Sequence, residues 1–121
     1  MQTSSLRLLG RKVLVTGSSK GIGRGIAVRM AQEGADVVVN YNTDPKGAEE
    51  ALTEVLATGR QGVAIQGDTS SVDGVGALVA ASARALGGLD VLVIALGECI
   101  SIGQVGSRAR PRDAVSHRVP N

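Results

Sequence analysis

Aromatic side chains are almost absent from this sequence, which has one tyrosine among its 121 residues and neither phenylalanine nor tryptophan. Because aromatic residues usually supply much of the buried area of a small domain, the core here has to be built from Val, Leu, Ile and Ala. Such a core suits a parallel sheet that helices cover on both faces. The length allows one domain of ordinary size and not two.

Cysteine and long apolar runs are also scarce. The single Cys99 cannot form a disulfide within the chain, which is typical of a reducing compartment, so we expect a cytoplasmic location. Residues 1–10 lack the apolar stretch and cleavage pattern of a signal peptide. No apolar run reaches the ~18 residues that a membrane-spanning helix needs, so we expect no membrane association.

Neither sign of charge is in large excess, since the formal net charge is +2. The arginines near the end of the chain are the one basic cluster: Arg108, Arg110, Arg112 and Arg118. A solvated chain end accounts for this cluster as well as contact with phosphates does. We therefore do not expect a nucleic-acid partner.

Glycine, in contrast, is frequent, with 17 residues and no collagen-like period. Short apolar runs alternate with segments of helical period that end at Gly34, Gly59 and Gly87. The predicted strands are 12–16, 36–40, 62–66 and 89–94, with one helix between each pair. With right-handed crossovers, this alternation predicts an α/β fold with a doubly wound parallel sheet in strand order 3-2-1-4.

The periodic pattern stops after Ile94. Residues 97–121 are rich in Gly, Ser, Arg and Pro and show no sustained period, so we expect an irregular, disordered tail after a half-domain of residues 1–96. The fourth strand would then be an open edge of an incomplete sheet. An unpaired apolar edge invites pairing with another chain, so we expect marginal stability and self-association through the exposed face or edge of the sheet.

A glycine-rich run between the first strand and the first helix, Thr16 to Gly23, carries the main functional signal. Gly17 would allow the sharp turn off the strand, Gly21 the close approach of a pyrophosphate, and Gly23 tight packing of the helix. The helix N-terminus would present free N–H groups to the phosphates. A glycine-rich turn without a ligand is the alternative, and the flanking strand and helix favour the dinucleotide site. A triphosphatase loop fits poorly, because Lys20 precedes Gly21.

From Leu8 to Val93 the chain resembles the short-chain dehydrogenase/reductase family. The resemblance rests on the glycine run with the strand before it, on the Gly-Asp-Thr-Ser run at 67–70 and on the Gly-Leu-Asp-Val-Leu-Val run at 88–93. It looks most similar to bacterial members related to glucose dehydrogenases and ketoacyl reductases. The resemblance implies a Rossmann-type fold and an oxidoreductase that transfers hydride between NAD(P) and an alcohol or carbonyl substrate.

The resemblance also implies a set of cofactor-binding residues: Gly17, Ser19, Lys20, Gly21, Ile22, Gly23, Tyr41, Asn42, Asp68 and Thr69. Within it, Ile22 lies under the cofactor, and Asp68 beside Thr69 accepts a hydrogen bond from the adenine amino group. A loop aspartate that caps the next helix is the alternative for Asp68. An acidic residue in the position of Tyr41 would bind the ribose 2′-hydroxyl of NAD, and this sequence has no acid there. Lys20 stands where NADP-preferring members carry a basic residue, which favours NADP over NAD, although a solvated loop lysine is the alternative.

The catalytic pattern of the family is missing from these 121 residues. Its chemistry uses a Ser and a Tyr-x-x-x-Lys pair, whereas the only tyrosine here is Tyr41 and the residue four positions later is Pro45. The family's Asn-Asn-Ala-Gly is replaced by Ile-Ala-Leu-Gly at 94–97. We therefore expect no catalytic residue, no metal site and no turnover, and we interpret the change after Ile94 as a truncation or a change of reading frame. The alternative is a non-enzymatic nucleotide-binding or interaction protein.

Overall fold

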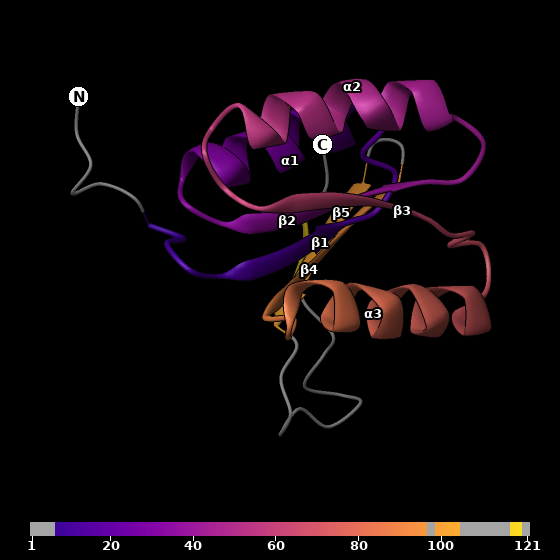
Figure 1. Ribbon diagram of the computed structural model, residues 1–121. Helices are drawn as coiled ribbons and strands as arrows, with labels where there is room; N and C mark the ends of the chain where they lie inside the picture. The colour runs from indigo at the N-terminus through magenta and orange to yellow at the C-terminus, as the bar shows by residue number, and fades with distance from the viewer. Residues whose placement is uncertain (1–6, 97–98, 105–116, 120–121) are drawn as a thin grey trace.

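The computed structural model describes residues 7–96, 99–104 and 117–119 (Figure 1). Strands and helices alternate from residue 12 to residue 96, and two further strands follow. The elements are β1 (Lys12–Val15), α1 (Gly21–Gln32), β2 (Asp36–Tyr41), α2 (Pro45–Leu56), β3 (Gly62–Gln66), α3 (Val72–Leu86), β4 (Val91–Leu96), β5 (Cys99–Gln104) and β6 (His117–Val119).

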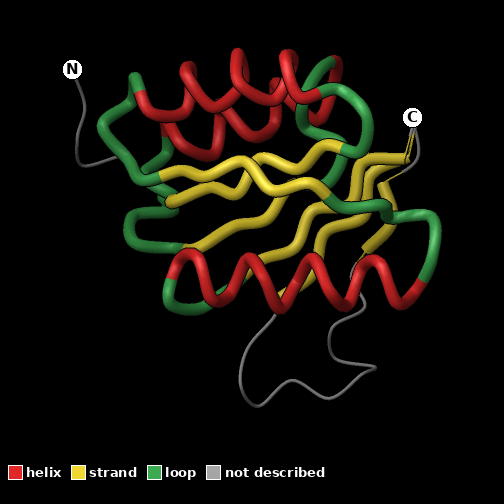
Figure 2. Tube along the Cα trace, turned by 45° about the vertical axis from the view of Figure 1, so that its right-hand side comes forward, coloured by secondary structure: helices red, strands yellow, loops and turns green. Residues whose placement is uncertain are grey.

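All six strands form one sheet in the order β3-β2-β1-β4-β5-β6. The first four strands are parallel, and Val13 of β1 pairs with Val37 on one side and with Val91 on the other. Helices α1 and α2 cover one face of the sheet, and α3 lies on the other (Figures 1 and 2). The Rossmann-type α/β fold and the order 3-2-1-4 of its parallel strands are thus confirmed.

Aliphatic side chains make up the core on both faces of the sheet. The α1–α2 face buries alternate valines of the central strands, Val13, Val15, Val37, Val39 and Val93, against alanines of the two helices. The α3 face buries Leu14, Val38, Leu78, Leu86 and Leu89. Each such side chain contributes about 1.5–3 kcal/mol when it leaves water, so these two clusters contribute strongly to the stability of the fold.

The residues after β4 correct one expectation. Residues 99–104 form β5 antiparallel to β4, and residues 117–119 form β6 antiparallel to β5, so β4 is not an open edge and the sheet does not end at four strands. Unpaired N–H and C=O groups along β4 favour any segment able to pair with them. The alternation Ile100-Ser101-Ile102 has the period of two that suits such a strand, and it is too short to be a signal by itself. The other residues of the expected tail lie outside the described ones.

None of the helices in residues 7–96 is both long enough and apolar enough to cross a membrane.

Candidate dinucleotide-binding site

Three loops that follow β1, β2 and β3 hold the candidate residues. Because these strands are parallel and in register, with Val15 opposite Val39 and Tyr41 opposite Gln66, their carboxyl ends lie at the same edge of the sheet. The structure therefore brings the glycine loop, Tyr41 with Asn42, and Asp68 with Thr69 to one edge. That edge is where open α/β sheets bind their ligands.

The three glycines of the first loop are needed for different structural reasons. Gly17 and Gly21 have φ of +59° and +64°, a conformation that side chains rarely adopt. Gly23 is buried, and a Cβ there would overlap the backbone carbonyl of Gly17. A Cβ on Gly21 would meet no protein atom within 4 Å. Gly23 thus allows the helix to pack on the loop, whereas the space beside Gly21 is open to a ligand.

Helix α1 begins at this loop without a side-chain cap. Lys20 occupies the N-cap position with an extended backbone, its ammonium group has no lone pair with which to cap the helix, and the first turn contains no acidic residue. The first backbone N–H groups of α1 therefore lack the partners that a capping side chain provides. Lys20 and Gly21 are exposed, and the side chain of Ile22 is 51% exposed. The helix N-terminus thus presents N–H groups of the kind that can bind an anion, with an accessible apolar side chain beside them.

One buried hydroxyl group, that of Ser18, holds the middle of the loop. The Ser18 hydroxyl donates to the carbonyl oxygen of Val15 at 2.7 Å and accepts from the Asn40 backbone N–H at 2.9 Å. Ser19 is only 6% exposed, so among the candidate residues it offers a ligand little surface.

At the end of β2, the candidate residues connect to β3. Tyr41 is partly buried against the α1–α2 side of the core, and its carbonyl accepts from the Gly67 N–H at 2.9 Å. Asn42 is exposed. Its backbone carbonyl oxygen and its side-chain oxygen each accept from the side-chain Nε2 of Gln66 at 3.2 Å. The nearby Asp44 caps α2, where its carboxylate accepts from the Gly47 N–H at 3.0 Å. That carboxylate is therefore already engaged in the fold.

Asp68 is exposed in the loop after β3 and does not cap α3. Its carboxylate accepts from the Ser70 backbone N–H at 2.9 Å, and this bond, with a second one to the Ser70 side chain, lowers the pKa of Asp68. Ser71 occupies the N-cap position of α3 and accepts from the Gly74 N–H at 3.0 Å. Asp68 is thus held as a carboxylate acceptor at the same edge as the glycine loop, with Thr69 half-buried beside it.

One residue of this edge was missed by sequence reasoning. Asn40, at the end of β2, is 2% exposed and hydrogen-bonds to the glycine loop and to the end of β3. A polar residue that ends a run of three buried valines is the only signal of it in the sequence.

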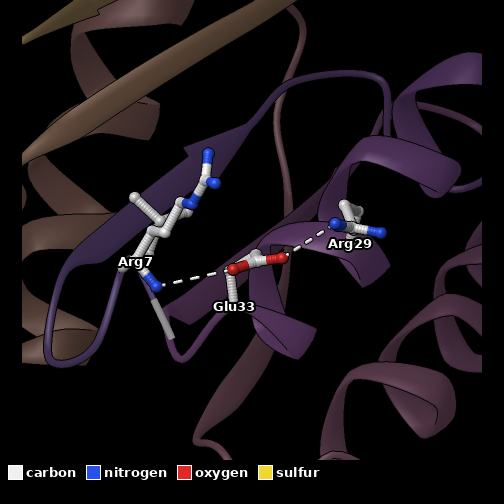
Figure 3. Close-up of a pocket in the computed structure, with 4 residues that line it drawn as sticks. Arg7, Arg29 and Glu33 are labelled. Atoms are coloured by element: carbon white, nitrogen blue, oxygen red, sulfur yellow. Dashed lines mark hydrogen bonds and ion pairs between the residues drawn. The ribbon is translucent and has the colours of Figure 1, made fainter. Parts of the chain in front are cut away.

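A surface pocket of about 460 Å³ lies elsewhere, where the chain enters β1 and α1 ends, at the amino ends of the strands (Figure 3). Glu33 pairs with the Arg29 guanidinium at 2.9 Å and accepts from the Arg7 backbone N–H at 3.4 Å. These contacts fasten the chain before β1 to the end of α1. The described residues include no group of three side chains placed to hold a metal ion.

Comparisons with known proteins agree with this arrangement. A family model described as short chain dehydrogenase matches residues 11–111. Glucose 1-dehydrogenase 2 of Bacillus subtilis is 44% identical over 86 residues, which are 71% of this chain and 33% of that protein. Hydroxynaphthalene reductase arp2 of Aspergillus fumigatus is 43% identical over 88 residues, 73% of this chain and 32% of that protein.

Solved structures show the same relation. A short chain dehydrogenase from Burkholderia cenocepacia, in complex with NADP, has a TM-score of 0.68 and 43% identity, covering 71% of this chain and 35% of that one. A dehydrogenase/reductase from Sinorhizobium meliloti has a TM-score of 0.73 and 36% identity, covering 79% and 38%. The chain thus spans about a third of the length of the curated relatives it matches.

Proposed function

Because the chain belongs to the short-chain dehydrogenase family, we propose that residues 1–96 bind the adenosine and pyrophosphate part of NADP or NAD. The loop from Gly17 to Gly23 carries this proposal. It combines two left-handed glycines, open space beside Gly21 and an uncapped helix N-terminus. A pyrophosphate needs this combination of close backbone approach and free N–H donors.

We propose NADP as the preferred dinucleotide. Lys20 is exposed at the loop and forms no ion pair within the described part of the chain, so its ammonium group is available to a 2′-phosphate. A carboxylate at the end of β2 would repel that phosphate, and Tyr41 and Asn42 stand there instead. The similarity to a structure solved with NADP agrees with this choice.

We further propose that the 121-residue polypeptide binds the dinucleotide without catalysing hydride transfer. The nicotinamide ring supplies the hydride chemistry when it is bound, and an alcohol or carbonyl substrate also needs a group that donates or accepts a proton. The only tyrosine, Tyr41, packs against the core beside the adenosine end of the proposed site. Reproducible NADP reduction by the purified polypeptide with any alcohol or sugar would contradict this proposal.

Two further proposals concern the surroundings of the chain. We propose that it self-associates through an exposed face or edge of the sheet; because β5 covers β4, the edge strands are β3 and β6. We also propose a reducing, cytoplasmic location from its single cysteine.

The dinucleotide site is tested by two matched glycine substitutions. Gly21→Val places a side chain in the space proposed for the pyrophosphate. Gly59→Val is the control, because Gly59 also has positive φ, +89°, and open space around it, and it follows the end of α2 away from the loop. Both changes strain the backbone in the same way. We expect calorimetry to show NADP binding in wild type and Gly59→Val and none in Gly21→Val. Equal NADP affinity in the two variants would refute the site.

A further inference from the structure

Asn40 is a buried polar side chain at the junction of the three loops. It follows three valines at the end of β2 and is 2% exposed. Burying an amide without partners is costly, so a buried asparagine is expected to have its donors and acceptor matched. The partners of Asn40 show what its burial achieves.

The Asn40 side chain joins the first loop to the third strand. Its Oδ1 accepts from the Gly17 backbone N–H at 2.9 Å. Its Nδ2 lies 3.2 Å from the carbonyl oxygen of Ile65 and 3.3 Å from that of Gly67. A third carbonyl, that of Tyr41, also lies 3.3 Å from Nδ2. One planar amide thus contacts the start of the glycine loop and the residue that precedes Asp68.

Backbone groups of Asn40 add to the same connection. The Ser18 N–H donates to the Asn40 carbonyl at 2.8 Å, and the Asn40 N–H donates to the Ser18 hydroxyl at 2.9 Å. Residues 17 and 18 are therefore held to β2 by both the main chain and the side chain of one residue.

We propose that Asn40 is a positioning residue that sets the distance between the pyrophosphate loop and the adenine loop. This inference rests on the proposed function, because the two loops would bind different parts of one dinucleotide. A rigid spacing lets both parts bind without the cost of ordering the loops. An amide suits this position, since its oxygen accepts from the Gly17 N–H while its NH₂ group donates to carbonyls on the other side. A leucine would leave the Gly17 N–H unpaired, and an aspartate would face carbonyl oxygens.

The proposal is tested with Asn40→Leu in the full 121-residue chain and with Val38→Ala as the matched control. Val38 is a fully buried residue of the same strand and sheet face, two positions earlier, and it packs in the core under α3. Both variants lose stability, and only Asn40→Leu loses the loop contacts. In the ligand-free chain we expect the Gly17 amide to exchange about tenfold faster or more in Asn40→Leu than in Val38→Ala. We expect NADP affinity to fall by a similar factor.

A second variant keeps the test decisive if Asn40→Leu fails to fold. Asn40→Asp retains the acceptor for Gly17 and loses the donor to the carbonyls of Ile65 and Gly67, so the Gly17 amide should stay protected while the end of β3 loosens. The Gly67 N–H, which donates to the Tyr41 carbonyl, should then exchange faster. If the Gly17 and Gly67 amides each exchanged as fast in wild type as in the variants, the positioning role would be overturned. If the wild-type chain bound no dinucleotide, the proposed function would fail, and the exchange rates would still decide whether Asn40 holds the two loops.

Discussion

The two halves of the sheet are built in different ways. Strands β1 and β2 pair in parallel between helix layers, and three consecutive valines of β2 are fully buried. Strand β5 pairs with β4 in the antiparallel direction, and its Ile102 remains 39% exposed. The parallel strands of the first half are packed by side chains on both faces, whereas what the structure describes of β5 is chiefly its backbone pairing with β4 and β6. The candidate site belongs to the first half.

The largest expected effect comes from the core of the first half. Leu14→Ala removes most of a fully buried side chain from the central strand and should lower the free energy of unfolding by about 2–5 kcal/mol, a large share of the stability of a small domain. Ile102→Ala in β5 should cost much less, because that side chain is already partly in water. Urea unfolding followed by circular dichroism measures both. Similar losses in the two variants would erase the difference between the halves.

Breaking the pairing of β5 should affect association more than binding. The double change Ser101→Pro and Ile102→Pro removes two adjacent N–H groups, which in a strand point to opposite sides, so pairing with both β4 and β6 is weakened. The exposed edge of β4 should then increase self-association in light scattering, while NADP affinity per folded chain changes little. Unchanged association would mean that β5 does not protect this edge.

A smaller effect is expected from Lys20. Lys20→Ala should reduce NADP affinity several-fold and leave NAD affinity nearly unchanged, since an exposed ion pair contributes at most about 1 kcal/mol. Arg11→Ala is the control, because it removes one exposed positive charge just before β1. Arg11 lies at the amino end of that strand, whereas the candidate site lies at the carboxyl ends. Calorimetry with both dinucleotides gives the ratio of affinities. The same ratio in both variants would leave Lys20 a solvated loop lysine.

The smallest effect is a pH dependence at Asp68. The hydrogen bonds from Ser70 lower the pKa of Asp68 in the folded chain below its ordinary value of 3.8. Its contribution to stability is therefore complete above the unfolded pKa and is lost as the pH falls through the lowered folded value. Asp68→Asn should flatten this part of the stability profile, as measured by melting temperatures across the acidic range. An identical acid dependence in both proteins would show that the bond to Ser70 adds no stability.

The alternation of strands and helices, the aliphatic core and the glycine loop could all be predicted from the sequence. Each depends on local signals: the period of apolar residues, the places where a helix ends, and positions such as Gly17 and Gly21 where the backbone needs positive φ. The family resemblance added the positions of Asp68 and Lys20, which the structure places at the same edge of the sheet.

Only the tertiary structure decided the rest. Asn40 looks in the sequence like the last residue of a buried strand, because its partners Gly17, Ile65 and Gly67 are 23 to 27 residues away. The pairing of β5 with β4 likewise follows from the unpaired edge that β4 presents, and a short Ile-Ser-Ile alternation does not encode it alone. Local patterns specify the backbone of a segment, whereas hydrogen bonds between distant segments exist only after the parallel core has brought them together.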